Sequence, residues 1–383
     1  MKLVFAHDHK LRKINDEYYT GGGLSDSITN RSTDQFDELT IIRRVIEKQE
    51  FDTQLFKISN QKISIKAASS GSIIPNRQAI NMIENEIKDA DGLIVKLHSK
   101  IAEIAIRYAR KYKIPYLIES VACPWDSYWN YNKIGKIIAP IMTFSTKREI
   151  KRAPYVIYVT KEFLQKRYPT IGKNIDCSDV ELKKIDNEVL KNRLEKIKSQ
   201  SKELVLGTLA QVDVRYKGQE YVIKAIAKLK QRGYIFRYRV AGSGDNSYLK
   251  AVAEKYNVLN QVEFYGVLAH SDVFEWLDDI DIYIQPSKQE GLPRAMIEAI
   301  SRACPAIGST AGGIGELIDN KYIFNKGSVK DICEILIHMD ANSMILQAKS
   351  NFNTSKNYDK NFLDKKRNKF YREFAEICKQ NSK

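Results

Sequence analysis

The chain has 383 residues, of which 43% are hydrophobic and 10% aromatic, with five cysteines and a formal net charge of +15. That length is too great for one ordinary core and suits two domains of about 150 to 200 residues with a ligand cleft between them. The composition excludes a disordered chain. The scattered cysteines, without a CxxC pair, exclude a disulfide framework and a zinc site, so we expect reduced thiols in a cytoplasmic protein.

The first apolar run, residues 2–6, is too short for the core of a signal peptide. No later window approaches the ~20 apolar residues of a membrane-spanning helix. The positive charge still favours an anionic partner such as lipid head groups, nucleic acid or a phosphorylated substrate. Residues 100–173 hold 15 Lys or Arg against 5 Asp or Glu, so much of the excess lies in one N-terminal region.

Short apolar runs alternate with amphipathic stretches along the chain, as in βαβ units that feed parallel sheets. Strands are expected at residues 2–7, 92–97, 115–120 and 155–160, and again at 204–209, 236–242, 262–266, 280–287 and 305–310. Between the two series, residues 174–202 are polar and predict an interdomain connection without a buried strand, followed by a surface helix. Basic amphipathic helices are expected at residues 99–113, 132–152 and 357–380.

This order of elements predicts an α/β protein with two doubly wound, Rossmann-like domains that face a central cleft. We expect an N-terminal domain over residues 1–180, a C-terminal domain over 181–350, and a helical tail over 351–383 that packs back on the N-terminal domain. Ligands in such sheets bind beyond the carboxyl ends of the strands, where loops lead into helices. The loops of the second domain are therefore expected to hold the site.

The segment QPSKQEGLPRAMIEAISRA fits that expectation. A strand ends near Ser287, a loop carries Glu290 and Gly291, and Pro293 suits the first position of a helix. Glu298 then falls in the second helical turn. The helix N-terminus offers unpaired N–H groups and a partial positive charge, which together suit a phosphate.

These residues resemble the retaining glycosyltransferases of the family 4 type, which are built on the two-domain GT-B fold. The shared mark is Glu290 followed by Gly291, with Glu298 after seven intervening residues. Further segments match the family in order and spacing: RYKG from Arg215, VAGSGD from Val240, VEFYGVL from Val262, DIYIQPS from Asp281 and ACPAIGSTAGGIGELI from Ala303. The resemblance covers essentially the whole second domain.

The resemblance implies a role for each residue of that site. Glu298 would bond the ribose hydroxyls of a nucleotide sugar, Glu290 would lie beside the donor sugar, and Lys217 would stabilise the charge on the leaving diphosphate. The other donor contacts are expected from loop residues, namely Gly291, Leu292, Pro293, Gly266 and Val267. The base is expected to be uracil or guanine, held largely by backbone, so the donor would be UDP- or GDP-linked.

In the first domain the resemblance is weaker and points to a subgroup that builds bacterial surface polysaccharides. It implies donor contacts from Gly22 and Gly23 of TGGGLS and a place near the reacting sugar for His98, which without it is read as a structural histidine. Three aromatic residues of CPWDSYWN are candidates to stack on an acceptor sugar or, equally, to form a packed lid: Trp125, Tyr128 and Trp129.

One departure from the family concerns the arginine that usually follows the glycine of the second domain's first strand. Thr208 stands at that position, and Arg215 is the candidate to replace the arginine on the diphosphate. If nothing replaces it, the chain would be a non-catalytic sugar-nucleotide-binding subunit. A sugar-nucleotide epimerase with the GT-B fold is a further alternative, although the glutamate pattern argues against it.

No metal and no cofactor are expected. The string Asp279–Asp281 matches the DxD of metal-dependent glycosyltransferases of another fold, but it precedes its strand and so lies at the end opposite the expected cleft. His7 and His9 are interpreted as loop residues after the first strand. The chain also lacks a recognised nucleic-acid-binding motif.

The sequence thus predicts a retaining, hexosyltransferase-type glycosyltransferase that extends a lipid-linked oligosaccharide in capsule or O-antigen assembly. We expect it in the cytoplasm, peripheral on the inner face of the plasma membrane. The basic helices at residues 99–113 and 132–152 would bind the anionic bilayer, the alternative being a solvated basic face over ordinary core helices.

Overall fold

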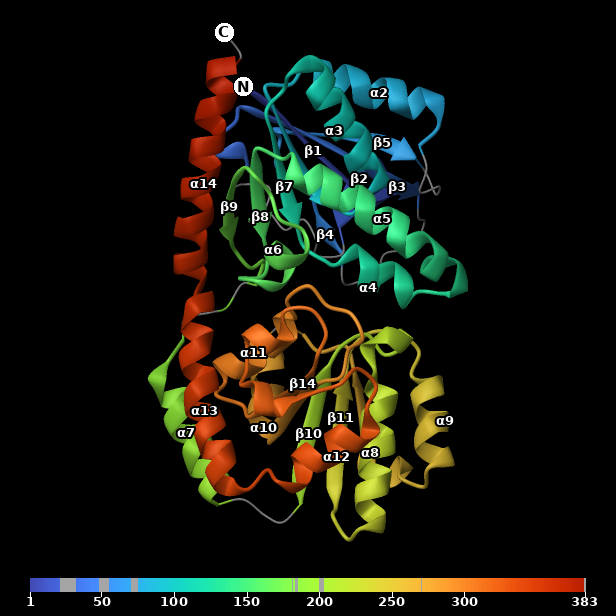
Figure 1. Ribbon diagram of the computed structural model, residues 1–383, viewed down its shortest axis with the longest axis vertical. Helices are drawn as coiled ribbons and strands as arrows, with labels where there is room; N and C mark the ends of the chain where they lie inside the picture. The colour runs from blue at the N-terminus through green and yellow to red at the C-terminus, as the bar shows by residue number, and fades with distance from the viewer. Residues whose placement is uncertain are drawn as a thin grey trace.

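A computed structural model describes residues 1–20, 32–47, 55–69, 75–180, 182, 185–199, 203–269 and 271–381. Figure 1 shows two α/β units, one above the other, each built on its own sheet with helices on its faces. Most strand pairs are parallel, and every pair in the second sheet is. The predicted fold class, two Rossmann-like α/β domains with parallel sheets, is confirmed.

The N-terminal sheet has the order β4-β2-β1-β6-β7-β8-β9, with β3 also on β1 and β5 on β3. Its strands are β1 Lys2–Ile14, β2 Glu17–Thr20, β3 Glu38–Glu47, β4 Phe56–Lys57, β5 Ile63–Ser69, β6 Gly92–Leu97, β7 Tyr116–Ser120, β8 Tyr155–Tyr158 and β9 Lys173–Asp176. The helices described in this unit are α2 Arg77–Lys88, α3 Lys100–Tyr112, α4 Pro124–Trp129, α5 Lys133–Lys151 and α6 Phe163–Arg167.

The first strand is longer than the sequence predicted. It runs on to Ile14, so His7 and His9 lie within β1 and not in a loop, and that interpretation was wrong. The pairing of β1 with β3 shifts between Ala6 and Lys10, as at a β-bulge, and the strand then continues beside β2. A bulge lets a strand carry polar residues through a bend without ending it.

The C-terminal sheet has the order β12-β11-β10-β13-β14-β15. Its strands are β10 Leu204–Leu209, β11 Phe236–Ala241, β12 Val262–Gly266, β13 Ile282–Gln285, β14 Ala306–Ser309 and β15 Ile323–Phe324. Its helices are α7 Asn187–Lys198, α8 Gln219–Gln231, α9 Ser247–Lys255, α10 Val273–Asp279, α11 Arg294–Ser301, α12 Val329–Ile337 and α13 Ala341–Ser355. All four residues of β13 are buried, as expected of a central parallel strand covered on both faces.

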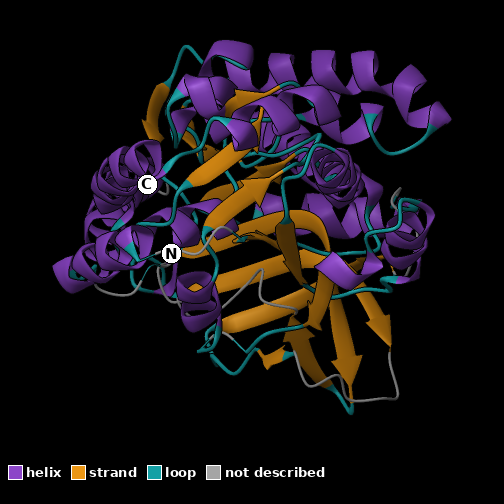
Figure 2. Ribbon diagram, turned by 90° about the horizontal axis from the view of Figure 1, so that it is seen from below, coloured by secondary structure: helices purple, strands orange, loops and turns teal. Residues whose placement is uncertain are grey.

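The last helix, α14 Lys360–Asn381, returns to the N-terminal unit, and Figure 1 shows it running alongside that unit after α13. Phe374 is fully buried, with its ring 5.6 Å from that of Tyr155 and 6.4 Å from that of Phe36. The Tyr371 hydroxyl donates to Glu119 at 2.7 Å. Apolar and polar side chains of α14 thus complete the face of the first sheet. Seen from below, helices flank the strands on either side (Figure 2).

Candidate functional site

Glu290 lies in the loop between β13 and α11, at the carboxyl end of a central strand. Lys217 Nζ donates to its Oε1 at 2.8 Å, and Gln285 Nε2 donates to the same oxygen at 3.1 Å. Gln285 is itself held by the hydroxyl of Tyr283 at 2.7 Å and lies 2.9 Å from that of Ser287. Residues 73 positions apart therefore meet in one fixed ion pair. An anion that reaches Lys217 would compete with Glu290 for the positive charge of the lysine.

Glu298 lies half-buried in the second turn of α11. Burial, and then the negative charges of Glu298 and Glu290, raise the pKa of the Tyr283 hydroxyl well above its ordinary value. Both carboxylates therefore act on one buried phenol at the end of β13. Pro293 is the residue that caps α11 and not its first helical residue, a shift of one position from the prediction.

At Gly291 the two domains approach each other closely. A Cβ at Gly291 would lie 2.0 Å from the carbonyl oxygen of Val121 in the N-terminal domain. A Cβ at the neighbouring Gly313 would lie 2.9 Å from Thr160 Cγ2, and 2.8 Å from Leu292 Cδ1. The expected close approach of backbone at Gly291 is thus made to the other domain.

Thr208 is fully buried within the second sheet. Its hydroxyl donates to the carbonyl of Ile284 at 2.8 Å and lies 2.8 Å from the hydroxyl of Tyr238. The position of the missing arginine is thus filled by a small residue whose hydrogen bonds are satisfied inside the domain.

Arg215 does not join the ion pair of Lys217 and Glu290. It lies in the single 3-10 turn Arg215–Lys217, and its Nη2 is 3.2 Å from Glu220 Oε1. The guanidinium carbon also lies 4.0 Å from the centroid of the Tyr248 ring. These contacts turn Arg215 toward α8 and α9, so Lys217 is the cation that the structure brings to Glu290.

Gly266 is the last residue of β12, and Val267 follows it at the carboxyl edge of the same sheet. Gly266 has a left-handed φ of 66°, and its carbonyl accepts the N–H of Gly242 at 2.7 Å. The Val267 side chain is exposed, so this loop is open to a ligand. Gly22 and Gly23, the remaining predicted donor contacts, lie outside the described residues.

On the N-terminal side, His98 follows β6, and its ring lies 5.3 Å from that of Tyr128 in α4. Burial lowers the pKa of His98 to about 4, so the imidazole is neutral at neutral pH. Trp125 and Trp129 stack on each other with ring centroids 5.1 Å apart, and Lys136 covers the Trp129 ring. The structure thus brings Tyr128 to His98 and pairs the two tryptophans with each other.

A carboxylate of the C-terminal domain holds a loop of the N-terminal domain. The side chain of Glu316 accepts three backbone N–H groups at 2.6, 3.1 and 2.7 Å, those of Lys161, Glu162 and Phe163. Sequence reasoning missed this contact, although Glu316 closes the segment ACPAIGSTAGGIGEL that was matched to the family.

The helix α4 is tied to the C-terminal domain as well. The carboxylate of the buried Asp126 accepts from Lys326 at 3.2 Å, and Asn130 Nδ2 donates to the Lys288 carbonyl at 3.4 Å. Lys288 lies two positions before Glu290. The aromatic loop is therefore fixed beside the loop that carries the first glutamate.

Asp8, between the two N-terminal histidines, and Asp281, the last residue of the Asp279–Asp281 string, both accept backbone N–H groups. Asp8 caps α3 by accepting the N–H groups of Lys100 at 2.7 Å and Ile101 at 3.0 Å. Asp281 precedes β13, away from Glu290, and accepts the N–H of Val205 at 2.8 Å. Within the described ranges, no three or more His, Cys, Asp or Glu side chains gather so that they could hold a metal ion.

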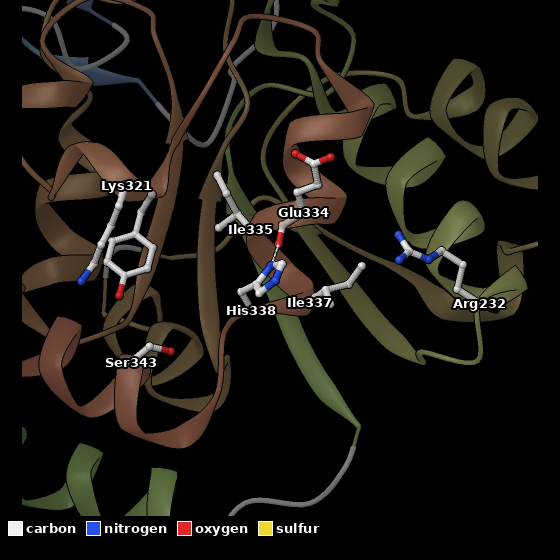
Figure 3. Close-up of a pocket in the computed structure, with 8 residues that line it drawn as sticks. Arg232, Lys321, Glu334, Ile335, Ile337, His338 and Ser343 are labelled. Carbon is white, nitrogen blue, oxygen red and sulfur yellow. Dashed lines mark hydrogen bonds between the residues drawn. The ribbon is translucent and has the colours of Figure 1, made fainter.

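A separate hollow lies at the carboxyl ends of α8 and α12 (Figure 3). Its lining consists of Arg232, Lys321, Tyr322, Glu334, Ile335, Ile337, His338 and Ser343. His338 Nδ1 lies 2.8 Å from the carbonyl oxygen of Glu334, a contact within α12. None of the predicted site residues lines this hollow, so it is distinct from the site around Glu290.

Two Rossmann-like domains that meet over a lysine–glutamate pair at the strand ends define the GT-B architecture of glycosyltransferases. Residues 191–353 match the family model of glycosyl transferases group 1. Protein CapJ of Staphylococcus aureus is 31% identical over 344 residues, which cover 88% of this chain and 85% of that protein. The chain therefore belongs to the group 1 glycosyltransferases.

Two further similarities concern part of the sequence and the fold. The amylovoran biosynthesis glycosyltransferase AmsK of Erwinia amylovora is 27% identical over 179 residues, 43% of this chain and 42% of that protein. The structure of HepE from Anabaena in complex with UDP-glucose superimposes with a TM-score of 0.63 at 14% identity, covering 96% of this chain and 98% of that chain.

The packing at Gly291 predicts that Gly291→Ala separates the domains. The added methyl group has no room beside the Val121 carbonyl, and overpacking of this kind costs about 1–3 kcal/mol. We expect a larger radius of gyration in small-angle X-ray scattering. Gly315→Ala is the control, because its Cβ would meet nothing nearer than 3.8 Å. An unchanged radius for Gly291→Ala would contradict the close contact.

Proposed function

We propose that the protein transfers a sugar from a UDP- or GDP-linked donor to a lipid-linked oligosaccharide, with retention of anomeric configuration, in capsule or O-antigen assembly. The observation that carries the proposal is the ion pair of Lys217 with Glu290 beyond the carboxyl end of β13, with Glu298 in the second turn of the helix that follows. AmsK, named for amylovoran biosynthesis, supports a surface polysaccharide as the product, and the complex of HepE with UDP-glucose supports a UDP-linked donor.

Each group at the site has a distinct task in this reaction. Lys217 takes up charge on the leaving diphosphate, at which point its bond to Glu290 is exchanged for a bond to phosphate. Glu290 is then left facing the donor sugar as positive charge develops at the anomeric carbon. Backbone N–H groups at the start of α11 add a partial positive charge. Pro293 itself has no backbone N–H to donate. Glu298 holds the ribose diol, and Gly266 and Val267 line the base.

The N-terminal domain supplies the acceptor side. His98 is neutral, so it acts as a hydrogen-bond partner for a sugar hydroxyl and not as a cation. Tyr128 lies against its ring and offers an aromatic edge to the acceptor. Trp125 and Trp129 form a stacked pair that borders the same loop.

Transfer without a metal ion is the direct test. Because Lys217 and the α11 N-terminus supply the positive charge, we expect UDP- or GDP-sugar turnover to persist in EDTA and the product to keep the donor's anomeric configuration by NMR. An inverted product, or a strict need for manganese, would contradict this mechanism. Nucleotide binding without transfer or donor hydrolysis would favour a non-catalytic subunit. This is the alternative to test, because Arg215 pairs with Glu220 and does not join the ion pair of Lys217 and Glu290.

Replacing each of the two glutamates by alanine should have a different effect. Glu298→Ala removes a charged acceptor for the ribose, which is worth about 1.5–3 kcal/mol, so nucleoside diphosphate should bind roughly 10- to 150-fold more weakly. Glu290→Ala should depress turnover while diphosphate affinity stays near that of the parent, because its task belongs to the sugar. Calorimetric titration and steady-state rates measure both effects. Reversed behaviour of the two variants would reverse the roles.

Attachment to the membrane is part of the proposal, and α5 supports it. Four large apolar side chains of α5 are exposed at spacings of three and four residues, which places them on one helix face: Ile134 at 66%, Ile137 at 74%, Ile141 at 67% and Phe144 at 71%. Exposed apolar faces bordered by lysines are typical of helices that lie in a membrane interface. In the described part of the chain, no helix is long and apolar enough to cross a membrane.

The basic residues divide between two tasks. On α3, Arg110 pairs with Glu149 at 2.7 Å and Lys111 with Glu84 at 2.6 Å, so part of that charge is neutralised within the domain. On α5, Lys133 and Lys147 border the apolar face and are exposed. We therefore assign attachment to α5, with its apolar face inserted and its lysines at the head groups.

The double change Ile137→Ser with Ile141→Ser should release the protein from vesicles. Each inserted isoleucine contributes about 1.5–3 kcal/mol, so binding should weaken at least ~100-fold. The measurement is flotation with vesicles that contain anionic lipid, at low salt. Leu346→Ser is a matched control, since this exposed side chain lies on α13 of the other domain. Equal flotation of the double variant and the parent would sink the assignment.

A further inference from the structure

Arg43, in the middle of β3, is buried without a charged partner. Its side chain is 1% exposed, and its guanidinium carbon lies 5.5 Å from the centroid of the Phe5 ring. Among the residues that the structure describes, neither Nε nor Nη1 has a hydrogen-bond partner, and no carboxylate forms an ion pair with Arg43. Burial lowers the pKa of Arg43 to about 9, so the group remains a cation at neutral pH.

Three other cations with little exposure, among the residues that the structure describes, have clear partners. Lys96, on a strand of the same sheet, lies 3.2 Å from Glu119 and 3.2 Å from Asp179. Arg367 of α14 lies 2.8 Å from Asp179, and Arg193 of α7 donates to backbone carbonyl oxygens. An unpaired buried charge is strongly unfavourable, and proteins normally pair such a charge or bury it against a bound ion. Arg43 departs from that pattern.

The surroundings of Arg43 are polar. Ala6 pairs with Ile42 of β3 and with Val95 of β6, so the residues that follow them, His7, Arg43 and Lys96, lie at the same level of three neighbouring strands. Burial, followed by the charges of Arg43 and Lys96, holds the pKa of His7 well below its ordinary value, and His9 and His98 also act on it. His7 Nδ1 lies 3.0 Å from the backbone N–H of His9 and accepts it, which places the His7 proton on Nε2. His7 and His98 are half-buried, and His98 lies at the site proposed for the acceptor.

We propose that Arg43, with His7 beside it on the neighbouring strand, forms a subsite for an oxyanion carried by the acceptor. A guanidinium presents two parallel N–H donors that match a phosphate or carboxylate, and the His7 Nε2–H supplies a further neutral donor. This inference rests on the proposed function, because it assigns the anion to the acceptor. The donor diphosphate has its own cation, Lys217, in the other domain.

The phosphate of a lipid carrier and the carboxylate of a uronic acid share this chemistry. Inorganic phosphate and glucuronate serve as separate probes, titrated by calorimetry with excess UDP present to occupy Lys217. We expect one of them to bind the parent protein and Arg43→Met to bind it roughly 10- to 150-fold more weakly. The probe that binds identifies the source of the anion. Arg77→Met, an exposed change on α2, is the control and should bind as the parent does.

Stability gives a second readout. Arg43→Met removes an uncompensated buried charge, so its melting temperature without anion should equal or exceed that of the parent, while the rise caused by the anion is lost. Should Arg43→Met not fold, Arg43→Lys keeps the charge and loses the two-point contact, and should also bind the anion more weakly. Parent-like anion affinity in the folded variant, or no affinity in the parent, overturns the subsite. Failure of both UDP and GDP to bind the parent would count against the proposed function alone.

Discussion

The contact between the two domains at Gly291 is the constraint on which the site depends. Backbone meets backbone there because a side chain would not fit against the Val121 carbonyl. The three N–H groups held by Glu316 fix a second pair of loops across the interface between the domains. The bond from Asn130 to the Lys288 carbonyl ties the end of α4 to the loop that carries Glu290. The placement of that loop is therefore a property of the interface and not of the C-terminal domain alone.

Much of this arrangement could be predicted from the sequence because parallel strands bring their carboxyl ends to one edge. That rule and the family resemblance predicted Glu290, Glu298 and Lys217 at one edge of the sheet, and the structure pairs Lys217 directly with Glu290. The partner of Arg215 could not be predicted from the sequence, because tertiary structure determines which of two acceptors a long side chain reaches. Strands β3 and β5 were missed for another reason: charged residues such as Arg43 interrupt their apolar runs.

The many basic residues of the chain do not form a single charged surface. Lysines and arginines of α3 are partly neutralised by nearby glutamates, and others hold backbone carbonyls inside the C-terminal domain. In the sequence, the apolar face of α5 appears only as isoleucines among lysines. A helical wheel does not show which face of the helix packs against the core. The structure turns the isoleucines outward, so the membrane attachment that we propose rests on insertion as well as on charge.

The return of α14 to the first sheet also bears on how the chain folds during synthesis. Phe374 packs against Tyr155 of β8, and Tyr371 bonds to Glu119 of β7. The N-terminal domain, although made first, leaves the ribosome with one face of its sheet uncovered until the last helix is translated. The C-terminal domain has its own strands complete before that moment. In this protein the order of synthesis and the order of completion are opposite, and the first-made domain is the one exposed to aggregation and proteolysis for longest.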